Sequence, residues 1–126
     1  MNIRALQRGL QYCGRVDAIR QTYHVFDGKG LFLVLSFARA KARRGSGYFN
    51  LVDKAAVDYV QARFGGTRGV TAKAVLAAAR RTRHIPTRLL ALNVLYVLVA
   101  LQRAAISRAG EHRQLFFSVR KARGVS

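Results

Sequence analysis

The side chains that could carry out catalysis are few and widely separated along the sequence. They comprise Asp17, Asp27, Asp53, Asp58, Glu111, His24, His84, His112 and Cys13. A two-metal site for phosphoryl transfer needs acidic residues close together, and no suitable pair is present. The stretch YHVFDGK places His24, Asp27 and Lys29 near a turn, which suggests a nuclease fragment, but we favour a strand histidine beside a turn aspartate. We therefore expect no enzyme, no metal and no cofactor.

The basic side chains are far more numerous and point to another chemistry. Lys and Arg number 23 against 5 Asp and Glu, giving a formal charge of +18. Such a charge favours a polyanionic partner, and nucleic acid is the leading one, with an anionic membrane surface a distant second. The candidate nucleic-acid contacts are Arg39, Lys41, Arg43, Arg44, Arg68, Lys73, Arg80, Arg81, Arg83, His84, Arg88, Asn93, Arg103, Arg108, Arg113, Arg120 and Lys121.

The first 47 residues must position part of this charge. Apolar residues at three- and four-residue steps predict a helix over residues 2–21, with Cys13 on its apolar stripe. Residues 23–37 predict a β-hairpin that turns at residues 27–30. The basic stretch ARAKARRGSG then predicts a flexible loop. Its charges could simply be solvated, but we prefer the interpretation that the loop contacts phosphates.

From residue 48 onward the expected order is a strand, three helices and a β-hairpin. Asp53 as N-cap predicts a helix to about Phe64, and Thr71 predicts a second helix over residues 71–83. Thr87 begins a third helix that extends to about Arg103. A turn at residues 109–111 then joins a strand around residue 106 to a strand over residues 114–119.

This order resembles a winged helix-turn-helix domain over residues 48–120. The stretches that carry the resemblance are VTAKAVLAAA, IPTRLLALNVLYVLVAL and AAISRAGEHRQLFFSV, which are similar to two helices of the motif and its wing. The resemblance implies an α+β fold with a three-helix core, a hairpin wing and an N-terminal helix and hairpin. We expect a single domain: an extension over residues 1–47, the winged-helix-like part over 48–120 and a basic tail over 121–126.

The third predicted helix departs from that pattern because it is apolar almost all round. Only Asn93, Tyr96, Ala100 and Arg103 form a line that could face outward. Asn93 as a base reader is the weaker interpretation, and packing inside the helix contacts is the stronger one. The apolar run Leu89–Leu101 has 13 residues. It would extend about 20 Å, short of the roughly 30 Å core of a bilayer, so no membrane span is expected.

These features predict a nucleic-acid-binding protein that contacts phosphates with weak sequence specificity. DNA binding, by a transcriptional regulator or a chromatin-type architectural protein, is preferred. An RNA-binding structural component, for example one associated with the ribosome, is the alternative. Either function implies a cytoplasmic location on the nucleoid or the ribosome, with homodimerisation or assembly into a ribonucleoprotein left open.

Overall fold

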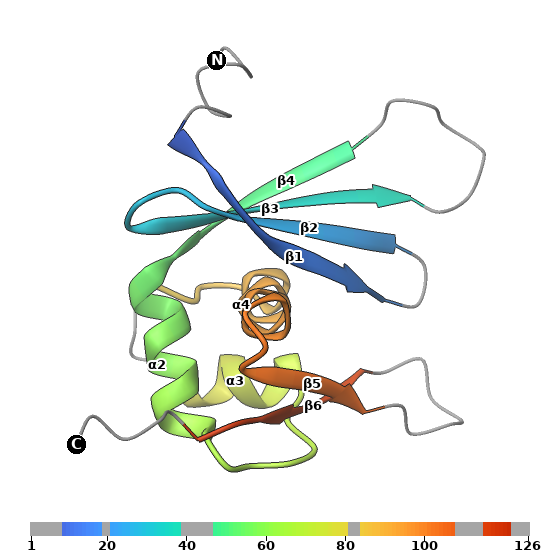
Figure 1. Ribbon diagram of the computed structural model, residues 1–126. Helices are drawn as coiled ribbons and strands as arrows, with labels where there is room; N and C mark the ends of the chain where they lie inside the picture. The colour runs from blue at the N-terminus through green and yellow to red at the C-terminus, as the bar shows by residue number, and fades with distance from the viewer. Residues whose placement is uncertain (1–8, 19–20, 39–46, 81–83, 108–114, 122–126) are drawn as a thin grey trace.

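The computed structural model describes residues 9–18, 21–38, 47–80, 84–107 and 115–121. In these residues a four-stranded antiparallel sheet is followed by three helices and a two-stranded hairpin (Figure 1). The elements are β1 (Gln11–Asp17), β2 (Gln21–Asp27), β3 (Leu31–Ala38), β4 (Gly47–Asp53), α2 (Lys54–Phe64), α3 (Ala72–Ala78), α4 (Arg88–Ala100), β5 (Ala104–Ser107) and β6 (Phe116–Val119).

The sheet is a meander in which each strand pairs with the next one along the chain. Because side chains alternate between the two faces of a strand, the register assigns one face to the core. On that inner face Val25 lies opposite Val34 and Phe32 lies opposite Val52, and all four side chains are buried. The predicted hairpin is confirmed, since β2 and β3 are joined by a turn at residues 28–30.

The predicted helix over residues 2–21 is wrong for residues 11–17, which form strand β1; residues 1–8 and 19–20 lie outside the described residues. The apolar spacing that suggested a helix is overridden by backbone pairing with β2, a contact between segments that the helical periodicity does not consider. An irregularity between Tyr12 and Gly14 shifts the register, and it places Gly14 against α4.

Helix α4 is the centre of the core. In Figure 1 it is seen end-on, with the sheet on one side and α3 and the β5–β6 hairpin on the other. Val94, Leu95, Val97 and Leu98 are all fully buried, which explains why the helix is apolar around its whole circumference. Among the described residues no helix is long and apolar enough to cross a membrane.

The helix starts are those the sequence predicted, although one cap works differently. The hydroxyl oxygens of Thr71 and Thr87 accept hydrogen bonds from the backbone N–H groups of Ala74 and Leu90, each at 3.1 Å. Asp53 occupies the N-cap position of α2 but makes no capping hydrogen bond, because its carboxylate lies 3.3 Å from His84 Nδ1. Helices α3 and α4 end at Ala78 and Ala100, earlier than predicted.

The winged-helix interpretation of the fold is wrong, although the chain is α+β. The order of elements from β4 to β6 follows the prediction, and the two strands of the predicted wing pair as expected. A winged helix, however, exposes its recognition helix to DNA. Here α4, which occupies that place in the order, is enclosed between a four-stranded sheet and the hairpin.

Candidate nucleic-acid interface

The end of α2, the connection to α3 and the end of the hairpin meet at one place on the molecule. The backbone N–H of Gly66 donates to the Val119 carbonyl at 2.7 Å, and that of Val119 donates to the Thr67 carbonyl at 2.9 Å. Val70 and Phe117 also exchange backbone hydrogen bonds, so residues 67–70 lie alongside β6. The connection between α2 and α3 is thereby fixed to the hairpin.

Several cations lie at this junction, and we call them the hairpin-end cluster: Arg63, Arg68, Arg103, Arg120 and Lys121. All five are exposed. The backbone N–H of Arg120 donates to the Arg103 carbonyl at 2.9 Å, and a Cβ placed on Gly65 would lie 3.2 Å from the Cα of Lys121. These backbone contacts bring residues from four segments of the chain together.

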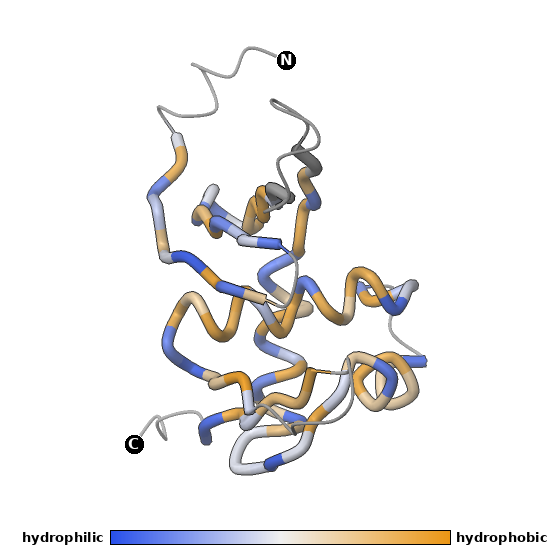
Figure 2. The backbone as a smooth tube through the Cα atoms, turned by 90° about the vertical axis from the view of Figure 1, so that its right-hand side faces the viewer, coloured by the Kyte–Doolittle hydropathy of each residue, from blue (hydrophilic) through white to orange (hydrophobic). Residues whose placement is uncertain are grey.

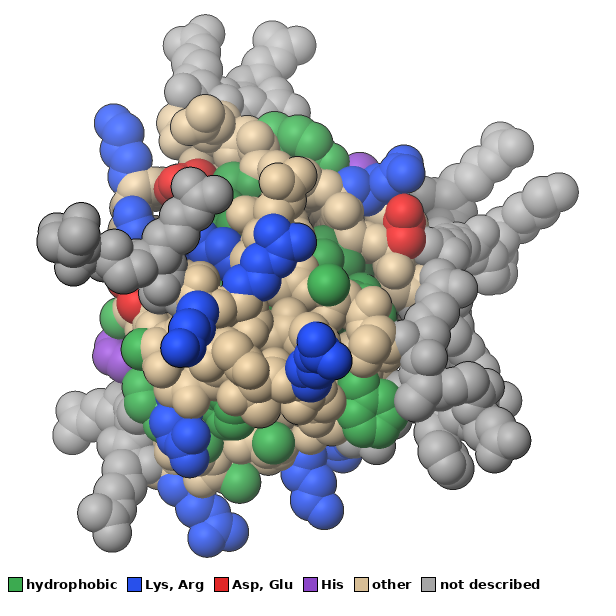
Figure 3. Space-filling model, turned by 60° about the horizontal axis from the view of Figure 1, so that its bottom comes forward, with side chains coloured by type: hydrophobic (Ala, Val, Ile, Leu, Met, Phe, Trp, Pro, Cys, Tyr) green, Lys and Arg blue, Asp and Glu red, His purple; other side chains and the backbone are tan. Residues whose placement is uncertain are grey.

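Two side chains of the cluster contact a neutral or an aromatic partner. The guanidinium of Arg103 donates to Gln61 Oε1 at 3.2 Å, and that of Arg63 lies 5.3 Å from the centre of the Phe64 ring. Within the described ranges no ion pair joins a member of the cluster to a carboxylate. In Figure 3, which brings the lower side of the molecule forward, Lys and Arg side chains are spread over the surface and the few acidic ones lie away from its lower centre. The junction therefore carries positive charge that no carboxylate of the described residues neutralises.

Four of the seventeen predicted contacts belong to this cluster, and Arg63 was missed. It stands in the last turn of α2, directly before the Gly65–Gly66 pair that ends the helix. The sequence contains that signal, since a helix end followed by GGTR places Arg63 and Arg68 on either side of one turn.

Other predicted contacts lie apart from the cluster or face inward. Lys73, Arg80 and Arg88 are exposed on or beside α3 and α4, and His84 faces Asp53. Asn93 is 1% exposed, and its amide donates to the Leu89 carbonyl at 2.8 Å. It therefore offers no surface to a base, and the same burial applies to Tyr96. Arg39, Lys41, Arg43, Arg44, Arg81, Arg83, Arg108 and Arg113 lie outside the described residues.

Of the residues considered for catalysis, the described part of the chain brings His84 and Asp53 together, at 3.3 Å and exposed to solvent, but it does not bring His24 and Asp27 together. His24 and Asp27 are three positions apart on β2, so they point to opposite faces of the sheet. The Asp27 carboxylate accepts the backbone N–H of Lys29 at 3.1 Å, which is turn chemistry. In the described part of the chain no three His, Cys, Asp or Glu residues are grouped to hold a metal ion.

Comparisons with protein-family models, with characterised proteins and with solved structures find no match to this chain.

Proposed function

We propose that the protein binds nucleic acid through contacts between the hairpin-end cluster and backbone phosphates. The observation that carries the proposal is that five exposed cations meet at one junction, where no carboxylate of the described residues is paired to them. Like charges held together by the fold repel one another, and a phosphate backbone relieves that repulsion and releases counterions. The net charge of +18 acts in the same direction over longer distances.

The binding has weak sequence specificity. Reading base edges in the major groove requires a helix or ribbon with exposed polar side chains. Helix α4 is buried, and of the exposed α3 positions Lys73, Ala74 and Ala77 only Lys73 can donate a side-chain hydrogen bond. This favours binding without base reading over a sequence-specific regulator. An architectural DNA-binding protein and an RNA-binding component both fit, without enzymatic activity, on the nucleoid or the ribosome.

Charge reversal within the cluster tests the proposal. The variant carrying Arg68→Glu, Arg120→Glu and Lys121→Glu, together with each of its three single substitutions, is compared with Lys54→Glu, a single charge reversal at the opposite end of α2. Affinity for a labelled 20-nucleotide oligonucleotide is measured by fluorescence anisotropy, and circular dichroism confirms folding. We expect the triple variant to bind more than tenfold more weakly and Lys54→Glu to bind within about threefold of the parent. Equal losses in the triple variant and in Lys54→Glu would refute a role for the cluster.

A further inference from the structure

The second face of the four-stranded sheet is not covered by any described element. Helix α4 packs against all four strands, and Figure 1 shows the three helices and the hairpin on the same side of the sheet. Figure 2 colours the backbone by hydropathy, and in β3 hydrophobic residues run without interruption from Leu31 to Leu35. A sheet covered on one side only normally carries polar side chains on the other.

The outer face departs from that expectation because its side chains are largely aromatic or aliphatic. The register places Tyr12, Phe26, Leu33 and Leu51 in one row across the four strands. A second row contains Arg15, His24, Leu35 and Phe49. Phe49 is 59% exposed, Tyr12 52% and Leu51 49%, which are high values for large apolar side chains. We call Tyr12, His24, Phe26 and Phe49 the aromatic face.

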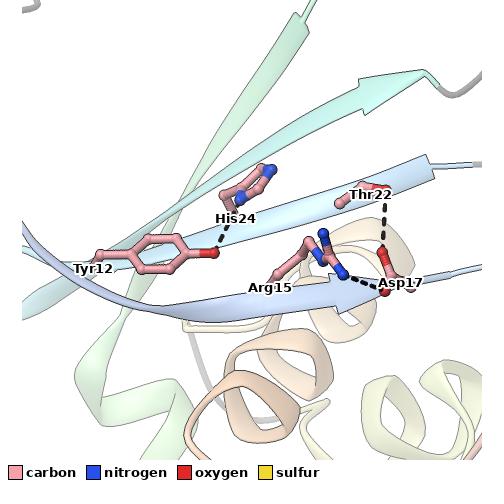
Figure 4. A network of polar contacts seen from close by, with 5 residues as sticks. All are labelled: Tyr12, Arg15, Asp17, Thr22 and His24. Atoms are coloured by element: carbon pink, nitrogen blue, oxygen red, sulfur yellow. Dashed lines mark hydrogen bonds and ion pairs between the residues drawn. The ribbon is translucent and has the colours of Figure 1, made fainter.

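Three rings of the aromatic face hold one another in place. Tyr12 packs edge-on against Phe26 with ring centroids 5.2 Å apart, and its centroid lies 5.9 Å from that of His24. The Tyr12 hydroxyl also lies 3.1 Å from His24 Nδ1, as Figure 4 shows. Rings fixed in this way lose little further freedom when a flat ligand stacks on them.

One described cation accompanies these rings, and basic residues are frequent in the connecting segments of the sequence. Arg15 shares the face, where it pairs with Asp17 at 3.4 Å, and Thr22 donates to the same carboxylate at 3.3 Å (Figure 4). The register also puts the ends of β1 and β3 at the same end of the sheet as the starts of β2 and β4. In the sequence, the segments that join those ends, residues 19–20 and 39–46, contain five basic and no acidic residues. Arg15 and the basic sequence of these connecting segments favour a partner that carries negative charge as well as flat apolar groups.

We propose that the aromatic face stacks the bases of a single-stranded nucleic acid. Exposed aromatic rings on a sheet bind unpaired bases in a sequence-tolerant way, whereas a duplex keeps its bases inaccessible. Tyr12 on β1 and Phe49 on β4 lie three strand spacings apart, about 14 Å, so the face accommodates more than one base. The inference rests on the proposed function, and it specifies which form of nucleic acid the protein prefers.

A tryptophan introduced at the most exposed ring tests the contact directly. The chain contains no Trp, so Phe49→Trp supplies a single fluorescent reporter on the sheet. We expect single-stranded oligouridylate or oligothymidylate to quench its emission, because a stacked base contacts the indole. Inorganic polyphosphate has the charge but no bases, and it should bind without quenching.

Three substitutions of the same residue separate stacking from simple apolar contact. Phe49→Ala and Phe49→Leu should each weaken single-strand binding by about tenfold, whereas Phe49→Tyr should retain it, because only an aromatic ring stacks. Duplex binding of the same length should change less than threefold. If Phe49→Leu binds like the parent, or if the variants change only self-association measured by sedimentation, stacking is refuted. Oligonucleotide binding without a Trp response would overturn this inference alone, and an absence of any binding would overturn the proposed function too.

Discussion

The phenol rings of Tyr23 on β2 and Tyr96 on α4 are stacked with their centroids 4.1 Å apart. The same Tyr96 ring meets Phe117 of β6 edge-on at 6.0 Å. One side chain therefore touches the sheet, the central helix and the hairpin. It explains why α4 cannot present its surface to DNA and why the sheet and the hairpin form a common core around it.

Removal of the Tyr96 ring should destabilise the protein severely. Tyr96→Ala deletes a 2%-exposed aromatic side chain and leaves a cavity between Tyr23 and Phe117, so a loss of about 3–5 kcal/mol in the free energy of unfolding is expected. Urea denaturation followed by circular dichroism measures it. Phe49→Ala, which removes a ring from the exposed face, serves as the control and should cost less than about 1 kcal/mol. Similar losses in the two variants would mean that Tyr96 is not a core residue.

Alkaline pH should destabilise the protein through the same residue. Burial, with the neighbouring Tyr23 as a second cause, raises the pKa of Tyr96 far above the usual tyrosine value of 10.0. Below that usual value the phenol is neutral in both states, and its contribution to stability is complete. As pH rises above about 10, only the unfolded state ionises readily, so stability falls. Absorbance at 295 nm should show Tyr96 titrating only with unfolding, and Tyr96→Phe should weaken the alkaline loss. Titration of all five tyrosines near pH 10 in the folded protein would contradict this.

A side chain at Gly14 should destabilise the protein. A Cβ at this position would lie 3.0 Å from the carbonyl oxygen of Ala100, at the end of α4. Gly14→Ala should cost about 1–3 kcal/mol because strand and helix must separate, and Gly14→Val should cost more. Gly9→Ala is the matched control, since a Cβ there meets nothing within 4 Å. Thermal unfolding compares them, and an unchanged midpoint for Gly14→Ala would show that β1 and α4 are not in close contact.

Cys13 should react slowly with thiol reagents while the protein is folded. Partial burial and then the Asp27 carboxylate raise the pKa of the thiol, so less of the reactive thiolate is present at a given pH. The rate of reaction with a disulfide reagent is measured against pH for the folded protein and for the protein in urea. The midpoint of the rise should lie at higher pH for the folded protein. Asp27→Asn should move the folded profile towards the unfolded one. If the pH–rate profiles of the folded and unfolded protein coincide, the fold does not raise the pKa of Cys13.

The parts of the fold encoded by local chemistry could be predicted from the sequence. Thr71 and Thr87 begin helices because each hydroxyl caps a backbone N–H three residues later, and this requires no distant partner. Strand β1 could not be predicted from periodicity, because Val16 and its neighbours adopt their conformation by pairing with β2. The winged-helix interpretation failed for a similar reason: the order of elements is local, whereas the sheet that encloses α4 is not.

In the candidate site, too, the residue types could be predicted from the sequence, but the contacts between distant segments could not. Arg103 and Arg120 were recognised as basic residues, but their backbone contact depends on how the hairpin closes on α4. The aromatic face was not recognised at all, since Tyr12 was assigned to a helix and Phe49 only to a short strand. A correct assignment of β1 would have placed Tyr12 and Phe26 on one face by the alternation of side chains.

The salt dependence of nucleic-acid affinity tests the central claim most directly. Binding of a labelled oligonucleotide is measured by anisotropy between 50 and 200 mM salt. If the five cations of the hairpin-end cluster each neutralise one phosphate, the slope of log K against log salt is about −4 to −5 on duplex DNA, and affinity falls several hundredfold over this range. A flat salt dependence, or no binding at 50 mM salt, would contradict the account.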